Sequence, residues 1–179
     1  MIKLALALLF ILTTLASYSF SIENPDSAKE VVDTLFSQFN FVVDLPHYLV
    51  FLVIFLNNSI KAFLAVLLGV LLIPPLFFVL TNGFILGIVV GVKGAEIGLV
   101  KTLMMILPHG IIEIPAMIIS AAYGMEIGIA VLKKIRNEEV NLSRVFHEKI
   151  VKFWKYLLPA FFTAALVETY LTPVVANLF

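Results

Sequence analysis

The sequence predicts an all-α membrane protein with about five transmembrane helices, some of them broken or re-entrant, plus amphipathic helices at the membrane interface. Three observations support this fold class. Of the 179 residues, 61% are hydrophobic and only 13% are charged, and the mean hydropathy is +1.08, values that are not those of a soluble domain. Several apolar runs approach or exceed the roughly 20 residues that cross a bilayer. The charged residues gather in short segments between these runs.

Composition also excludes several function classes. Twelve basic and twelve acidic residues cancel, and no basic stripe with interleaved aromatic residues is present, so nucleic acid is not an expected partner. The chain has no cysteine, which excludes disulfides, thiolate metal sites and cysteine nucleophiles. His-Glu-x-x-His, Gly-x-Ser-x-Gly and a pair of intramembrane aspartates are absent as well. The sequence therefore leans against an enzyme without deciding the question.

Residues 1–20 predict a first transmembrane helix. Lys3 precedes an apolar run that ends near Ala16 and is followed by small residues, a pattern that also fits a cleaved signal peptide. We favour the uncleaved helix. Residues 21–45 form an acidic segment expected outside the cell, in which a capping box begins at Ser27. Apolar residues then recur at helical spacing and predict an amphipathic helix: Val31, Val32, Leu35, Phe36 and Phe39.

Residues 46–179 are expected to form the polytopic membrane domain. The apolar stretch from Tyr48 to Leu80 is longer than one crossing needs. Either a short re-entrant piece precedes a crossing that starts near Asn57 as its N-cap, or one helix begins at Tyr48 and turns at the prolines. We prefer the first reading, because asparagine caps helices well and fits poorly against lipid.

The next two crossings differ in their small residues and prolines. The spacing of Gly83, Gly87 and Gly91 lets two helix backbones approach closely, within one subunit or at the seam of a homodimer. Pro108 suits the first turn of a helix. It therefore predicts that the following crossing starts there and is kinked at Pro115.

Charge sets the expected orientation. The loop at 133–155 holds seven basic residues against three acidic ones, so the positive-inside rule makes it cytoplasmic. Its apolar stripe with Trp154 predicts a helix at the inner interface. Counting crossings from Lys3 agrees, which places the N-terminus in the cytoplasm and the C-terminus outside a plasma membrane. The last crossing repeats Ala160, Ala164, Glu168 and Thr172 every four residues.

Polar side chains inside the apolar runs are the candidate site. His109 and Glu113 are four residues apart and share one helix face, and Glu168 on the last small-residue face is their expected partner. A histidine and two carboxylates suit a divalent metal such as zinc, with one position open to water. Alternatively, neutral glutamates form a polar clasp with His109, Asn57 or Asn82, or the acids relay ions or protons.

These residues resemble the stage II sporulation protein M family of integral membrane proteins. The resemblance runs from about Asn57 to the end. Its motifs are Asn57-Asn58, Asn82-Gly83, Pro108-His109-Gly110-Ile111-Ile112-Glu113 with Pro115-Ala116, and Glu168 with Thr172-Pro173. It implies a multi-helix membrane protein whose polar motif residues cluster inside the bundle. The family's namesake acts beside cell-wall-degrading partners, but similar proteins occur outside spore formers, so sporulation does not carry over.

The function that we expect is a membrane-embedded assembly or partner-recruiting component. Its partners are the lipid bilayer, unidentified proteins and, as one reading of the glycine spacing, a second copy of the chain. Two alternatives stay open. The intramembrane carboxylates and broken helices would also suit a transporter or ion-conducting protein, and a metal-bound water would suit an intramembrane hydrolase.

Overall fold

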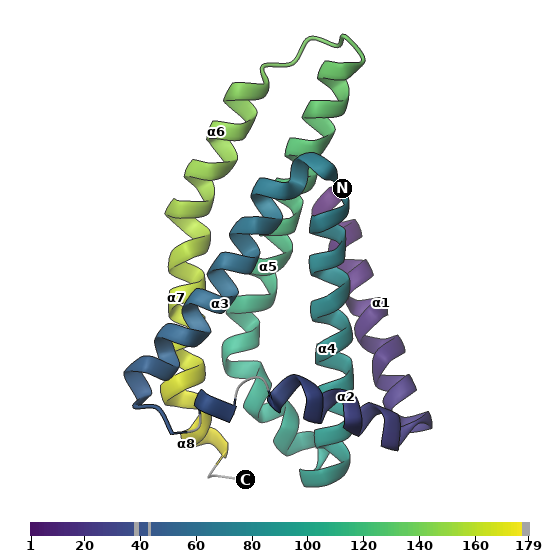
Figure 1. Cartoon of the computed structure of the whole chain (residues 1–179), viewed down its shortest axis with the longest axis vertical. Coiled ribbons are helices and arrows are strands. Elements are labelled where there is room, and N and C mark those ends of the chain that lie inside the picture. Colours follow the sequence, from purple (N-terminus) through teal and green to yellow (C-terminus); the bar gives the residue numbers. More distant parts are fainter. Residues whose placement is uncertain (38–39, 43, 177–179) are drawn as a thin grey trace.

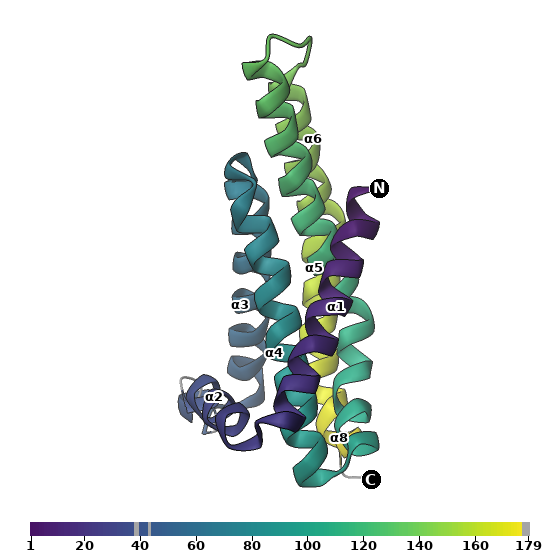
Figure 2. The ribbon, with the colours of Figure 1, turned by 90° about the vertical axis from the view of Figure 1, so that its right-hand side faces the viewer.

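The computed structural model describes residues 1–37, 40–42 and 44–176, and these form helices and short connections (Figures 1 and 2). Five helical stretches are long and apolar enough to cross a membrane, which confirms the predicted fold class. The first four are α1 (Ile2–Glu23), α3 (His47–Leu67) with the 3₁₀ turn Leu68–Leu71, α4 (Ile73–Ile97) and α5 (Leu99–Ile135). The fifth joins α6 (Leu142–Lys152), α7 (Leu158–Leu166) and α8 (Thr172–Ala176) through π-helical segments at Phe153–Leu157 and Val167–Leu171.

The helices run alternately up and down one axis (Figure 1). The N-terminus lies towards the end that carries the loop between α5 and α6. The amphipathic helix α2 (Pro25–Ser37) and the C-terminal helix α8 lie at the opposite end. The basic residues of the loop and Lys3 are thus on one side, as the count of crossings predicts. That this side is the cytoplasm remains a prediction from the positive-inside rule.

The glycine stripe of α4 packs against α1. A Cβ added at Gly83 would lie 2.9 Å from the Phe10 carbonyl oxygen, and one added at Gly87 would overlap Ser17 and Thr14. The Ser17 hydroxyl lies 3.4 Å from the carbonyl oxygen of Gly83. The glycines therefore serve a close helix contact within the chain. Since α1 occupies this face, the spacing no longer supports a homodimer.

Helix α2 is the predicted amphipathic helix, with two differences. It begins at Pro25, where the missing N–H is no loss in a first turn, two residues before the expected cap at Ser27. Its buried side, Ala28 and Val32, packs on Ile88 and Val92 of α4. Of the predicted apolar positions, Phe39 lies outside the described residues.

Asn57 is not an N-cap. Helix α3 is continuous from His47 to Leu67, so the second of the two sequence readings is correct. The chain turns at Leu72, whose φ is 63°, and Pro74 and Pro75 stand in the first turn of α4. The preference of asparagine for caps is overridden because Asn57 faces a polar cavity rather than lipid.

Helix α5 does not start at Pro108. It begins at Leu99 after Gly98, whose φ of +94° suits glycine, and it passes through both Pro108 and Pro115. Each proline removes one backbone hydrogen bond without ending the helix. His109 consequently lies well inside α5 and not at its N-terminus.

The basic segment contains a helix, α6, that runs along the long axis of the bundle (Figure 1). Helix α6 continues into the last crossing and packs along α5, and the two form a hairpin that extends beyond the turn between α3 and α4 (Figures 1 and 2). Val145 and Ile150 pack on the core, whereas Trp154 is 55% exposed. The predicted apolar stripe is present, but the part of it that contains Val145 and Ile150 packs inside the bundle against α5.

Candidate functional site

An imidazole and two carboxylates meet in the middle of the bundle. His109, Glu113 and Glu168 each offer one ligand-type atom, and these three atoms all lie within 4.8 Å of one another. All three side chains are half-buried. Residues 109 and 113 are one turn apart on α5, and Glu168 comes from the π-helical segment of the last crossing. The structure thus brings together the three side chains that the sequence singled out.

Small residues let the two helices approach. On α5, Ala116 and Ser120 continue the face of Glu113 and are 3% and 0% exposed. On the last crossing, Ala164 is 1% exposed and lies one turn before Glu168. The π-helical segment then widens the turn that carries Glu168, a feature that is frequent at functional sites. Helix packing therefore positions the acids, as expected from the small-residue faces.

His109 is oriented by a threonine of the last crossing. Its Nδ1 lies 3.4 Å from the Thr172 hydroxyl oxygen. Within the described chain, neither glutamate makes a hydrogen bond to His109, Asn57 or Asn82. The hydrogen bonds expected of a polar clasp are thus not formed.

The three asparagines line the cavities beside these ligands. Asn57 donates to the Asn58 side-chain oxygen at 3.1 Å, and Asn82 donates to the Phe78 carbonyl oxygen at 2.7 Å. A cavity of about 570 Å³ is lined by Asn57 and Asn58 together with the imidazole and both acids. Another, of about 420 Å³, is lined by Asn82 and the same three side chains. The asparagines therefore surround the ligand triad without touching it through hydrogen bonds.

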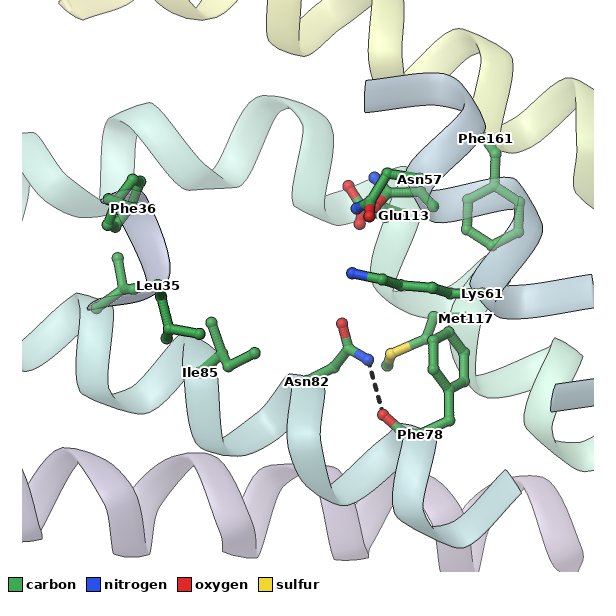
Figure 3. Close-up of a pocket in the computed structure, with 12 residues that line it drawn as sticks. Leu35, Phe36, Asn57, Lys61, Phe78, Asn82, Ile85, Glu113, Met117 and Phe161 are labelled. Carbon is green, nitrogen blue, oxygen red and sulfur yellow. Dashed lines mark hydrogen bonds between the residues drawn. The ribbon is translucent and has the colours of Figure 1, made fainter. Parts of the chain in front are cut away.

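Lys61 is a site residue that the sequence reasoning did not single out. It lines a third cavity, of about 280 Å³, with Asn57, Asn58, Asn82 and Glu113. Figure 3 shows its ammonium group extending into this space between Glu113 and Asn82. The spacing in the sequence could have identified it, because Asn57 and Lys61 are four residues apart and therefore share a face of α3.

Five apolar crossings around ionisable and amide side chains define a multi-pass membrane protein with an intramembrane polar site. The chain belongs to the stage II sporulation protein M family, whose model matches residues 6–173. The match begins in α1 and includes residues 6–45, so the family resemblance is wider than the motifs from Asn57 onward indicated.

Two relatives come from Methanocaldococcus jannaschii. Uncharacterized protein MJ0706 is 31% identical over 132 residues, which are 72% of this chain and 58% of that protein. Uncharacterized protein MJ0793 is 31% identical over 128 residues, 68% of this chain and 71% of that protein. The chain thus spans less than two thirds of the first relative. No solved structure matches the chain significantly.

Proposed function

We propose that this protein is a membrane-embedded assembly component that holds a divalent cation between α5 and the last crossing. One observation carries the proposal: the imidazole of His109 and the carboxylates of Glu113 and Glu168 converge within 4.8 Å. Nitrogen and carboxylate oxygen ligands with a position left for water are those of zinc sites. Zinc is therefore the ion that we expect.

The spacing and the surroundings suit such an ion. Zinc bonds of about 2.1 Å allow two ligands of one ion to lie up to about 4 Å apart, so small side-chain rotations would close the site. Two carboxylates in an apolar interior are costly unless they are neutral, paired or bound to a metal. A cation shared by Glu113 and Glu168 would remove that cost and link two helices that are distant in the sequence.

The partner-recruiting part of the proposal rests on the α5–α6 hairpin. This hairpin projects past the rest of the bundle (Figure 1) and exposes Leu132 and Ile135, which are 40% and 71% exposed. It also carries most of the basic residues of the loop. An apolar tip among basic residues is a suitable contact for a protein partner at an anionic membrane surface.

The cavities support assembly over transport. The two larger cavities that include Glu113 extend towards Phe36 of α2, at one end of the bundle. A cavity at the other end, between α5 and α6, is lined by Ile127 and His147 and shares no lining residue with them. A transport path would join the polar centre to both ends, so access from one side favours a held ion.

Metal analysis of the purified protein tests the proposal. We expect about one zinc ion per chain, bound in the unmodified protein and lost in His109→Ala. The matched control is His147→Ala, which removes a histidine from the cavity beside α6 and should retain the metal. Equal zinc in all three proteins, or none in the unmodified protein after purification with zinc present, would contradict a site at His109.

A further inference from the structure

The cavity of about 280 Å³ beside Glu113 is amphipathic. Its lining comes from α2, α3, α4, α5 and α7. Figure 3 shows the polar groups of Lys61, Asn57, Asn82 and Glu113 close together, with apolar side chains on both sides of them. Leu35, Phe36 and Ile85 lie on one side, and Phe78, Met117 and Phe161 on the other (Figure 3). Ligand pockets are lined mainly by apolar side chains with a few polar groups that fix the orientation of the ligand. This division suits a molecule with a polar head and an apolar chain.

Lys61 determines which charge the polar head of such a molecule would carry. It lies six residues before the end of α3, about 9 Å along the helix axis, so its charge is placed within the apolar crossing. It forms no ion pair with any residue in the described part of the chain. A lysine near a helix end often extends to the interface, but Figure 3 shows Lys61 crossing the cavity instead. Glu113 faces this charge across the cavity without forming an ion pair with it (Figure 3), which leaves the ammonium group available to an anion.

The two neighbouring amides add donors. Asn57 and Asn82 each use one N–H of the side-chain amide in the hydrogen bonds to Asn58 and Phe78. An amide group has two N–H donors, so one remains on each residue. Hydrogen bonds from amides and an ammonium group to an ionised oxygen are stronger than those between neutral groups.

The cavity is accessible from the bilayer side. Lys61 is exposed, and its neighbours on α3, Ile60 and Leu64, are 54% and 44% exposed as lipid-facing residues. Ile85 of α4, which also lines the cavity, is 38% exposed. A ligand with an apolar chain would enter between these two helices without crossing water.

We propose that this cavity binds the carboxylate or phosphate head of an anionic amphiphile that enters from the bilayer. Lys61 binds the anionic oxygens, Asn57 and Asn82 donate to them, and the first part of the chain lies along Ile85, Leu35 and Phe36. The volume is close to the lower limit of about 300 Å³ for ligand pockets, so the rest of the chain extends into lipid. The inference rests on the proposed function in one respect: the cation bound by Glu113 offsets the repulsion between that carboxylate and the anionic head.

Photolabelling in phosphatidylcholine vesicles tests this inference. The probe is a long-chain fatty acid with a diazirine in its chain, and the neutral probe is the corresponding fatty alcohol. We expect the acid to label peptides of α2 and α4 that line the cavity. Lys61→Met should lower this labelling about tenfold, the effect of losing a hydrogen bond to a charged group. The control Lys133→Met, at the solvent end of α5, should leave it unchanged.

The controls separate the competing outcomes. Equal labelling by acid and alcohol, or equal labelling of the Lys61→Met and Lys133→Met proteins, would overturn the anionic site. Loss of labelling with excess inorganic phosphate would show that the cavity takes soluble anions and would overturn entry from the bilayer. Zinc is measured in the same samples. Full zinc without labelling overturns this inference alone. Lys61-dependent labelling without zinc overturns the proposed function, together with the part of this inference in which a cation at Glu113 offsets the repulsion, and leaves the anion site at Lys61 standing.

Discussion

His109 and Thr172 are 63 residues apart in the sequence, yet Nδ1 of the ring and the hydroxyl oxygen lie 3.4 Å apart. The same hydroxyl lies 3.4 Å from the carbonyl oxygen of Val167, to which it donates. Because a hydroxyl has one proton, its oxygen accepts from His109 when Nδ1 carries the ring proton. Nε2 then keeps its lone pair, the form in which an imidazole binds a metal.

Thr172→Val should weaken zinc binding without unfolding the protein. Valine keeps the shape of threonine but cannot accept the hydrogen bond that orients His109. Removing such a partner costs about tenfold or more in metal affinity, which a competition titration with a chromogenic chelator would measure. The matched control is Thr163→Val, because the Thr163 hydroxyl donates to the Pro159 carbonyl oxygen on an exposed face. An equal loss in both variants would argue against an orienting role.

Helix periodicity explains why much of this site was predictable. The four-residue spacing of His109 and Glu113 fixes their common face in any helix, and the small residues before Glu168 predict a close neighbour. These are local properties of the sequence. The number of crossings was predictable for the same reason, since each apolar run must hydrogen-bond its own backbone in lipid.

The remaining features depend on tertiary structure. Asn57 looked like a cap because its local preference is for helix ends, but a cavity made by four other helices accommodates it within α3. Lys61 was not singled out because its cavity neighbours are far away in the sequence. Pro108 looked like a start because the helix actually begins at Leu99, where the capping residue Gly98 has no side chain to cap it. In each case a weak local preference was outweighed by packing between distant helices.

Glu113→Gln should separate a metal site from a clasp. Glutamine is neutral and nearly the same shape, so we expect the stability of the metal-free protein to change by less than about 1 kcal/mol. The unmodified protein should gain about 2.7 kcal/mol when zinc is present at about 100 times its Kd, and the variant should lose most of this gain. Thermal unfolding with and without zinc measures both quantities. A severe loss of stability without metal would instead favour an ionised Glu113 that other groups stabilise.

Gly87→Ala should separate α1 from α4. The added Cβ would overlap the Thr14 carbonyl oxygen, which is backbone and cannot move aside, so we expect a loss of about 1–3 kcal/mol in the free energy of unfolding. Gly94→Ala is the control on the same helix, because its Cβ would lie 3.5 Å from Leu99 Cδ1, an ordinary contact. Denaturation in mixed micelles, followed by circular dichroism, measures both. Equal stability of the two variants would contradict the packing of α1 on the glycine stripe.

Glu126→Gln should loosen the α5–α6 hairpin. Glu126 of α5 forms an ion pair with Lys149 of α6, whose side chain is only 13% exposed, and the ammonium group lies 5.2 Å from the centre of the Tyr123 ring. The variant leaves Lys149 with one remaining counter-charge, the 45% exposed carboxylate of Glu148 at 3.7 Å. We expect a loss of about 2 kcal/mol, between the values for exposed and buried pairs.

Glu148→Gln is the matched control for this pair. Glu148 binds Lys152 within α6, where both side chains are more than 40% exposed, and it also lies 3.7 Å from Lys149. Because solvent and salt screen an exposed carboxylate, the expected loss is below about 0.5 kcal/mol even though Glu148 contacts both lysines. Combining Glu126→Gln with Lys149→Met removes both charges of the inner pair. This double variant should recover part of the stability lost in Glu126→Gln, because no uncompensated charge is left against α5. If the two losses simply add, the pair is not coupled and the hairpin is held by its apolar contacts alone.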